Sequence, residues 1–390
     1  MGDSAPVRSH AIEAGIRRAA DERLCLLLPH TTATMRAARY HGRADVRVEE
    51  VKSASVGPGE VRIEVGACGI CGSDLHEYAA GPIFVPDGTP HPVSGDRLPI
   101  TMGHEFSGVV REAGEGVDDL AAGDRVAINP ILSCGECRQC VEGNYHVCDS
   151  IGFIGLSGGG GGFAEEFVAD AEHAVPLADE VSLAAGALVE PLSVGFHAVR
   201  RSGLQVGDDI AVFGSGPIGL SVVQCARAAG AGRIIVSEPR DARRERAAAC
   251  GADDLVDPAA TDAVDHIAEA TGGGVDVALE AAGVGATYDA ALGSARPGGT
   301  VTVVSIWEEE VTTDPNAVVL GERTVTGTLA YLGGPRADEE FGDVIDMLAE
   351  GTLDPEPLIT DRIGLDGVVD EGFEALLDED SDQVKILVEP

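Results

Sequence analysis

An apolar strand leads into a glycine-rich turn and a helix in the stretch Ile210-Ala-Val-Phe-Gly214-Ser-Gly216-Pro-Ile-Gly219. In a G-x-G-x-x-G pattern the first glycine permits the tight turn, the second lets the backbone approach a pyrophosphate, and the third lets helix and strand pack closely. The N-terminus of the helix also favours phosphate groups. The sequence therefore predicts a dinucleotide-binding loop made by Gly214, Gly216, Pro217, Ile218 and Gly219.

Glu238 follows the next apolar run, 19 residues after Gly219. A carboxylate at this spacing hydrogen-bonds the ribose 2′-hydroxyl of NAD and repels the 2′-phosphate of NADP. We therefore expect NAD as the cofactor, bound by Glu238 and Arg243. Because Arg240, Arg243 and Arg244 would weaken this preference, NADP stays open as the less favoured cofactor.

Strands and helices alternate from about Val206 onward, which predicts a parallel sheet covered by helices. From Met35 to about Asp170 the chain instead reads as short strands separated by Gly and Pro, which indicates an irregular β-rich domain. The predicted strands include 61–65, 125–129, 210–213, 233–237, 275–279, 301–304 and 383–388, and the predicted helices are 217–229, 241–250 and 341–350. We therefore expect an α/β chain with two domains of different kinds.

The composition of the 390-residue chain is strongly acidic, with 66 Asp and Glu against 27 Lys and Arg and a net charge of -39. Only Lys52 and Lys385 are lysines. Such a surface repels phosphate backbones and anionic membranes, so neither nucleic acid nor a membrane is expected as a partner. The apolar fraction of 44% is too high for a disordered chain. We expect a salt-adapted globular protein, whose self-repulsion is screened at high ionic strength.

Four of the nine cysteines lie within 15 residues and follow the spacing C-x2-C-x2-C-x7-C. Four thiolates on one loop can close a tetrahedral shell around zinc, as structural sites do. An iron–sulfur cluster is less favoured, because ferredoxin runs end in C-x3-C-P. We therefore expect a structural zinc in a reducing compartment, which points to the cytoplasm, and the predicted ligands are Cys134, Cys137, Cys140 and Cys148.

Further ligand-type residues occur at three separate places, 68–76, 103–105 and 190–191. One thiolate, one imidazole and one or two carboxylates leave a coordination position free, which is typical of a catalytic zinc site. Zinc lowers the pKa of a bound hydroxyl, and this suits hydride transfer from an alcohol to nicotinamide. We therefore predict a second, catalytic zinc, with two carboxylates that also take part in catalysis; the predicted ligands are Cys71, His104, Glu105 and Glu190.

A proton must also pass between such a buried site and water. The hydroxyl of Ser73, two residues from Cys71, and the imidazole of His76 suit a proton relay. Asp74 is in a position to orient His104 by accepting a hydrogen bond from its ring. We therefore expect Ser73 and His76 to be catalytic and Asp74 to support the zinc ligand.

These segments together resemble the zinc-dependent medium-chain dehydrogenases, over essentially the whole of residues 35–390. The motifs that carry the resemblance are C-G-I-C-G-S-D-L-H at 68–76, G-H-E at 103–105, the four-cysteine segment, G-G-F-A-E at 161–165, E-P-L-S-V-G at 190–195 and G-S-G-P-I-G at 214–219. The resemblance implies a GroES-like catalytic domain, residues 35–190 plus 331–390, with a Rossmann domain, residues 191–330, inserted between its two parts. It also implies that Glu105 or Glu190 completes the catalytic zinc site, directly or through water, as in polyol-type members.

Residues 1–34 lie outside the resemblance and carry four arginines and four acids, so their net charge is zero. We expect an N-terminal extension whose order the sequence leaves open. Met35 is a second possible start of the native protein.

The stretch between His76 and His104 is the best indication of the substrate. Its G-P-I-F-x-P at 81–86, H-P at 91–92 and M-G-H-E-F-S-G at 102–108 resemble the 2,3-butanediol dehydrogenases. The resemblance implies an NAD-dependent oxidoreductase for a secondary alcohol or vicinal diol that forms homodimers or homotetramers. Sorbitol, glucose or threonine as the substrate, and a catalytically silent nucleotide-binding relative, stay open as alternatives.

Overall fold

The computed structural model describes residues 34–307, 310–378 and 380–390. The extension expected at residues 1–34 lies, apart from Thr34, outside this described part of the chain. Among the described helices, none has both the length and the apolar character needed to cross a membrane.

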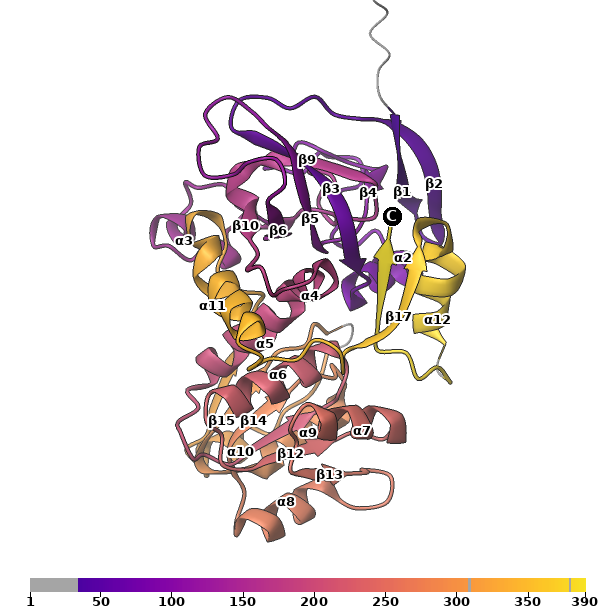
Figure 1. The fold of residues 1–390 in the computed structure, drawn as a ribbon. Helices are drawn as coiled ribbons and strands as arrows, with labels where there is room; N and C mark the ends of the chain where they lie inside the picture. Colours follow the sequence, from indigo (N-terminus) through magenta and orange to yellow (C-terminus); the bar gives the residue numbers. More distant parts are fainter. Residues whose placement is uncertain (1–33, 308–309, 379) are drawn as a thin grey trace, which may run out of the picture. The chain divides into compact units, whose positions relative to one another are not determined.

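The second half of the chain forms a six-stranded sheet in the order β13-β12-β11-β14-β15-β16 (Figure 1). All of its strand pairs are parallel. This order is that of a doubly wound dinucleotide-binding fold, so the predicted Rossmann domain is confirmed. The strands are β11 (Ile210–Phe213), β12 (Ile234–Ser237), β13 (Asp254–Val256), β14 (Val275–Glu280), β15 (Ala295–Val303) and β16 (Thr324–Gly327).

The apolar run of β11 explains why this sheet is covered on both faces. Ile210 and Val212 pack in one hydrophobic cluster, and Ala211 and Phe213 pack in another. Successive side chains of a strand point to opposite faces, so a strand with helices on both sides has no polar face. The helices of this region are α6 (Pro217–Ala228), α7 (Asp241–Ala249), α8 (Ala263–Thr271), α9 (Gly285–Ser294) and α10 (Pro315–Val319).

A largely antiparallel sheet brings the C-terminal segment back to the first third of the chain. Its order is β10-β6-β5-β3-β18-β17, and β9 also pairs with β3. Leu387 of β18 lies opposite Gly69 of β3, and in Figure 1 the yellow C-terminal segment lies beside the indigo β3. The strands are β3 (Glu60–Gly69), β5 (Glu105–Ala113), β6 (Arg125–Ile128), β9 (Glu166–Asp170), β10 (Ala174–Pro176), β17 (Ile359–Gly364) and β18 (Lys385–Glu389).

Smaller sheets complete the β-rich part, and the remaining helices lie within it or where the chain passes to and from the parallel sheet. The short sheets contain β1 (Thr34–Gly42), β2 (Asp45–Lys52) and β4 (Ile100–Thr101) in one case, and β7 (Ile131–Leu132) and β8 (Gly152–Phe153) in the other. The helices are α2 (Gly72–Ala80), α3 (Arg138–Val141), α4 (Leu183–Ala187), α5 (Val189–Ser202), α11 (Ala337–Ala349) and α12 (Glu374–Leu377). Single turns of other helix types lie at 145–147, 171–173, 334–336, 365–367 and 368–373.

Most predicted elements are present, but three of them begin well before or after the predicted residue. The strand predicted at 301–304 begins at Ala295, where the residues are not an apolar run although Ala295 already lies opposite Val275 of β14. The helix predicted at 341–350 begins at Ala337, because its acidic first turn suits a helix N-terminus although it is not apolar. The strand predicted at 383–388 begins at Lys385, because the Gln383 carbonyl accepts a hydrogen bond from Arg243 outside the sheet.

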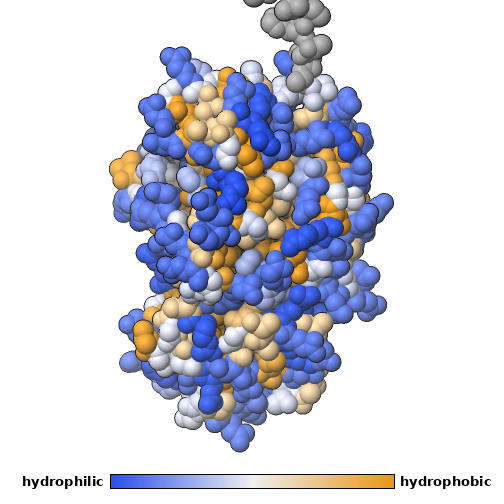
Figure 2. All heavy atoms as spheres, viewed as in Figure 1, coloured by the Kyte–Doolittle hydropathy of each residue, from blue (hydrophilic) through white to orange (hydrophobic). Residues whose placement is uncertain are grey.

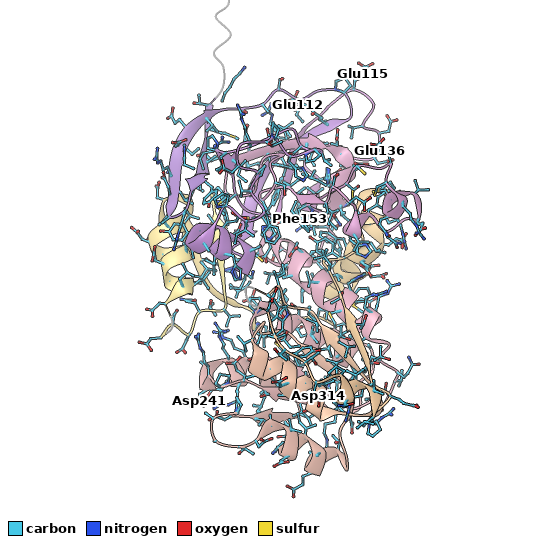
Figure 3. All side chains as sticks on the ribbon, turned by 180° about the vertical axis from the view of Figure 1, so that it is seen from behind. Glu112, Glu115, Glu136, Phe153, Asp241 and Asp314 are labelled. Atoms are coloured by element: carbon cyan, nitrogen blue, oxygen red, sulfur yellow. The ribbon has the colours of Figure 1, made fainter. Side chains whose placement is uncertain are left out.

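The surface is dominated by hydrophilic side chains on the face drawn in Figure 2, with apolar side chains scattered between them. The acidic residues labelled in Figure 3 are all exposed and are spread over both the β-rich part and the parallel-sheet part. They are Glu112, Glu115, Glu136, Asp241 and Asp314. The negative charge is therefore distributed over the surface and is not confined to one patch.

Candidate active site

The glycine loop has the room that a bound pyrophosphate needs. Gly214 has a φ of +94°, a left-handed conformation that favours glycine. A Cβ on Gly219 would collide with the Gly214 carbonyl, whereas Gly216 faces open space. Pro217 and Ile218 form the first turn of α6. The loop and the helix N-terminus therefore fit a dinucleotide.

Glu238 directly follows β12, as predicted, and its almost fully buried side chain lies beside the glycine loop. Its carboxylate accepts hydrogen bonds from the backbone N–H groups of Ser215 and Arg240, each at 3.0 Å. The Ser215 hydroxyl donates to the same carboxylate at 3.2 Å. Sequence reasoning missed Ser215, because the second position of the glycine pattern has no fixed residue type.

The three arginines near Glu238 all donate to backbone carbonyls. The pairs are Arg240 to Ser381 (3.2 Å), Arg243 to Gln383 (3.2 Å) and Arg244 to Glu238 (2.6 Å). A cavity of about 470 Å³ beside them is lined by several carboxylates, among them those of Asp241, Asp380 and Asp382. The charge around this cavity is therefore mainly negative.

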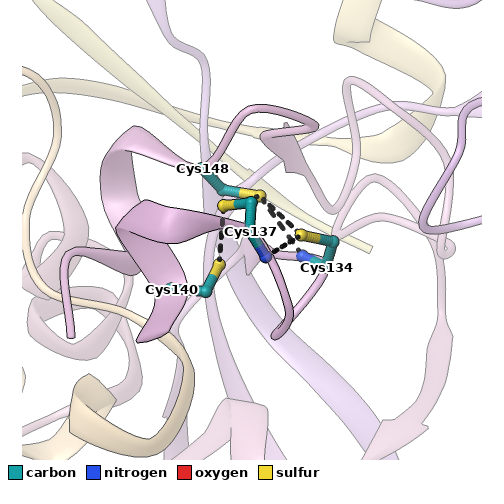
Figure 4. A group of neighbouring side chains, drawn as sticks. All are labelled: Cys134, Cys137, Cys140 and Cys148. Atoms are coloured by element: carbon teal, nitrogen blue, oxygen red, sulfur yellow. Dashed lines mark hydrogen bonds between the residues drawn. The ribbon is translucent and has the colours of Figure 1, made fainter. Parts of the chain in front are cut away.

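The four predicted structural ligands converge in one loop, residues 134–148, which we call the four-cysteine lobe (Figure 4). The Sγ–Sγ distances are 3.4 Å for Cys134–Cys148, 3.5 Å for Cys137–Cys140 and 3.9 Å for Cys137–Cys148. A tetrahedral shell with Zn–S bonds of about 2.3 Å has sulfur–sulfur distances of about 3.8 Å. All four are free thiols. The lobe therefore fits a structural zinc ion.

Backbone N–H groups prepare the lobe for a cation. Those of Asp149 and Cys140 lower the pKa of Cys137 to about 6. The backbone N–H of Cys134 points to the Cys148 sulfur at 3.3 Å. Because N–H groups stabilise a thiolate, and the thiolate is the form that binds metal, these contacts favour zinc binding.

A second group contains Cys71, His104 and Glu105, whose ligand atoms all lie within 4.8 Å of one another. Cys71 precedes α2 as its N-cap residue, and Glu105 is the first residue of β5. His104 and Glu105 are buried. A thiolate, an imidazole and a carboxylate with room for a fourth ligand fit a catalytic zinc ion.

His104 is flanked by two side chains of α2. Its Nε2 lies 3.2 Å from Ser73 Oγ. Its Nδ1 lies 3.5 Å from Asp74 Oδ1, and neither of these two buried atoms has a hydrogen-bond partner in the structure. His76 is half-buried and lies one turn beyond Ser73 on the same helix. The structure thus brings the predicted relay residue Ser73 and the predicted orienting residue Asp74 to the His104 ring.

Glu190, in the first turn of α5, is buried but is not part of the Cys71, His104 and Glu105 group. Its Oε1 accepts a hydrogen bond from the Tyr331 hydroxyl at 2.7 Å. Burial, followed by repulsion from Glu105, raises the pKa of Glu190 to about 7. Sequence reasoning did not identify Tyr331, because it belongs to no recognised motif.

Lys385 also belongs to this site and was not predicted. Its Nζ donates to both carboxylate oxygens of Glu105, at 2.7 and 2.6 Å, and to the Ile70 carbonyl at 2.8 Å. Burial opposes its charge, but its contacts with Glu105 and the nearby negative charges of Cys71 and Glu190 together more than offset this and raise the pKa of Lys385. The sequence feature that could have identified Lys385 is a lysine, rare in this chain, within the apolar C-terminal strand.

The comparisons with known proteins agree with this geometry. Residues 57–179 match the alcohol dehydrogenase GroES-like domain, and residues 217–350 match the zinc-binding dehydrogenase family. The chain is 46% identical to (R,R)-butanediol dehydrogenase of Bacillus subtilis (strain 168) over 91% of this chain and 100% of the relative. It is 34% identical to sorbitol dehydrogenase of the same strain over 93% of this chain and 99% of the relative.

A solved structure gives the same result. The X-ray structure of 2R,3R-butanediol dehydrogenase from Bacillus subtilis matches with a TM-score of 0.85 at 46% identity, and the match covers 91% of this chain and 99% of that chain. The GroES-like and Rossmann folds predicted from the sequence are therefore confirmed. The chain belongs to the zinc-binding medium-chain alcohol dehydrogenase family, whose members are oxidoreductases that act on CH–OH donors.

Proposed function

We propose that this chain is an NAD-dependent dehydrogenase of a vicinal diol or secondary alcohol, of the 2,3-butanediol/acetoin type. The observation that carries the proposal is the buried group of Cys71, His104 and Glu105, which leaves one metal position for a hydroxyl. The identity of 46% to a butanediol dehydrogenase, against 34% to a sorbitol dehydrogenase, favours the diol over a sugar alcohol.

In this proposal each residue of the site has its own role. When bound, zinc polarises the substrate hydroxyl and NAD accepts the hydride. Ser73 Oγ accepts the hydroxyl proton as its own proton passes on to His76 of the same helix, and His76 releases a proton to water. Asp74 fixes the ring of His104 through Nδ1, which lies 3.5 Å from its carboxylate. Glu190, the second carboxylate, contributes to the catalytic zinc site through a water molecule near Glu105.

We propose two zinc ions per chain, the catalytic one at the Cys71, His104 and Glu105 group and the structural one in the four-cysteine lobe. The lobe supports the second assignment because four free thiols lie within 4.8 Å of one another. Zinc content per folded chain, measured by atomic absorption, should be close to two.

NAD is the proposed cofactor, with NADP disfavoured. A 2′-phosphate would meet the Glu238 carboxylate and the acidic cavity lined by Asp241, Asp380 and Asp382. The three nearby arginines already donate to carbonyls, so a phosphate would have to displace these contacts. A kcat/KM that is higher with NADP than with NAD would contradict this proposal.

The experiment that tests the substrate is an NAD-reduction screen at molar salt. It compares the stereoisomers of 2,3-butanediol with sorbitol, glucose, threonine and simple secondary alcohols. We expect the highest kcat/KM with a butanediol stereoisomer. Activity confined to sorbitol, glucose or threonine would reject the diol, and activity with none of the compounds would favour the catalytically silent relative.

A homodimer or a homotetramer is proposed from the edge of the parallel sheet. β16 is the last strand of that sheet, and Val319, Leu320 and Val325 nearby are 67%, 83% and 38% exposed. An open strand edge beside apolar side chains is suited to pairing with a second copy. Light scattering should give the mass of an oligomer for the native chain, and a smaller mass for Leu320→Asp.

The remaining proposals concern domains and location. We propose a catalytic domain of residues 35–190 plus 331–390 and a Rossmann domain of residues 191–330; the pairing of β18 with β3 supports the joining of the two catalytic segments. The described cysteines are all free, which supports a reducing compartment such as the cytoplasm.

A further inference from the structure

Lysine is a rare choice in this chain, and one of its two lysines is buried at the metal site. Basic positions other than Lys52 and Lys385 are arginines. Lys52 is exposed, whereas Lys385 is only 1% exposed. An ammonium is a compact point charge, whereas a guanidinium is broad and planar. The choice of lysine at 385 therefore indicates a position that needs the compact ammonium group and not a guanidinium.

The contacts of Lys385 use its full donor capacity. Its three N–H groups match three acceptors, the two oxygens of Glu105 and the Ile70 carbonyl, at 2.6 to 2.8 Å. Ile70 directly precedes Cys71 in the chain. Lys385 therefore contacts both segments that supply the Cys71, His104 and Glu105 group, one at the Ile70 carbonyl and the other at the Glu105 carboxylate. The ammonium is therefore fixed in one place.

Glycine at position 69 makes room for this ion pair. A Cβ at Gly69 would collide with Glu105 Oε2 and would lie 3.3 Å from Lys385 Cδ. Gly69 lies opposite Leu387 in the β3–β18 pair. The missing side chain at Gly69 thus leaves a small space beside β3, which Glu105 of β5 and Lys385 of β18 occupy together.

We propose that Lys385 is a positioning residue that makes Glu105 a weak, exchangeable zinc ligand. This inference rests on the proposed zinc site. With both oxygens of Glu105 in contact with Nζ, zinc and the ammonium compete for the same carboxylate. A positive charge next to the group also repels a dication. The weak binding of Glu105 lets it leave the metal and return, which opens a second position beside the one that the three ligands leave free while substrate enters or product leaves.

Replacing the ammonium by a neutral group tests this role. In Lys385→Met, Glu105 binds zinc without competition, so we expect the catalytic zinc to be held about tenfold more tightly. Affinity is measured by competition with a chelator, with the lobe zinc counted separately. We expect kcat for the alcohol to fall while KM changes less, and the visible spectrum of the Co²⁺-substituted protein to change. Lys52→Met is the matched control and should leave all of these values unchanged.

The direction of the change separates positioning from a structural role. A structural lysine would lower both the melting temperature and the zinc affinity when it is replaced. A positioning lysine lowers the melting temperature but raises the zinc affinity. If folded Lys385→Met binds zinc as tightly as the native chain or less tightly, the inference is overturned. It is also overturned if the double variant Lys385→Met, Glu105→Gln shows the same gain in zinc affinity as Lys385→Met alone.

A second variant keeps the inference testable if Lys385→Met does not fold. In Glu105→Gln, loss of a weak ligand should reduce zinc affinity less than about tenfold, whereas loss of a strong ligand would reduce it about 100-fold or more. The larger loss overturns the inference. If the native chain binds zinc only in the lobe, the proposed function itself fails, and this result is distinct from the others.

Discussion

The four-cysteine lobe and the Cys71, His104 and Glu105 group are both metal sites by their donor atoms, but they are built in different ways. The lobe takes four thiols from 15 consecutive residues, and its sulfurs contact one another and nearby backbone N–H groups. The second group takes its donors from two segments, and its Glu105 is held by Lys385, 280 residues away.

This difference has a physical meaning. Four identical soft ligands in one loop close a shell that needs little from the rest of the fold, so the lobe is suited to stability. The second group has three different donors and is surrounded by charged or acidic side chains, among them Asp74, Lys385 and Glu190. Such surroundings adjust how strongly each ligand binds, which a catalytic metal requires.

The largest expected effect is at the second group. In Cys71→Ser, we expect kcat/KM to fall by about 10³-fold or more, because the metal loses its thiolate ligand. Zinc content should fall from two to one per chain while the melting temperature changes little. Full activity in this variant would show that the two sites have been assigned wrongly.

The lobe should respond in the opposite way. In Cys137→Ser, we expect the free energy of unfolding to fall by about 3 kcal/mol, since loss of a metal is among the largest single-residue effects. The folded fraction should keep kcat within about twofold, because in this assignment the lobe zinc takes no part in catalysis. Urea unfolding and active-site titration measure the two quantities, and a large loss of kcat in folded enzyme would contradict the structural role.

A largely buried cluster connects the four-cysteine lobe with helix α5. His146 of the lobe packs edge-on against His197 of α5, with ring centroids 5.0 Å apart. Both carboxylate oxygens of Glu340 lie 3.0 Å from His197 Nδ1, and one accepts the Leu332 backbone N–H at 2.8 Å. In Glu340→Gln, we expect a loss of about 1 to 3 kcal/mol of stability near pH 7, because a buried charge-assisted contact is removed.

The same variant should change the pH dependence of stability. Burial opposes the charge of Glu340, but the contacts with His197, the Leu332 backbone N–H and Arg200 together outweigh it and lower the pKa of Glu340 below its ordinary 4.5. A carboxyl whose pKa is lower in the folded state stabilises the protein above its unfolded pKa, and this contribution is lost as pH falls through the folded value. The variant should therefore lose less stability than the native chain below about pH 4.5.

Glu339→Gln is the matched control for this experiment. Glu339 is the neighbouring residue, and its side chain is 47% exposed and paired with Arg336. Exposed ion pairs contribute little, so we expect a change of about 0.5 kcal/mol or less. An equal effect of the two substitutions would show that the cluster of His146, His197 and Glu340 has no special role in stability.

A rise in salt concentration should change the zinc affinity of either metal site least of all. Its effect on the stability of the fold should be small but measurable. Raising KCl from 0.1 M to 2 M screens repulsion among exposed carboxylates, and we expect a gain on the order of 1 kcal/mol in stability. The Lys385 and Glu105 pair is buried, so zinc affinity of the second group should change little. A melting temperature that is the same at both salt concentrations would reject salt adaptation.

Some of the fold and site was predictable because the residues involved are close in the chain. The glycine loop from Gly214 to Gly219 and the lobe are local patterns, and both fold as expected. Cys71 and His104 were predicted from short motifs of ligand residues. Tyr331 and Lys385 were not predictable in this way, because each acts on a residue more than 100 positions away.

The sequence by itself determined the class of the protein, since strand and helix periodicity, glycine spacing and cysteine spacing are read within a few dozen residues. Tertiary structure decided how the site works. The return of β18 beside β3 brings Lys385 to Glu105, and the hydroxyl of Tyr331 donates a hydrogen bond to the second carboxylate, Glu190. One contact is a buried ion pair and the other a buried hydrogen bond to a carboxylate, and burial of this kind arises only when distant segments pack together.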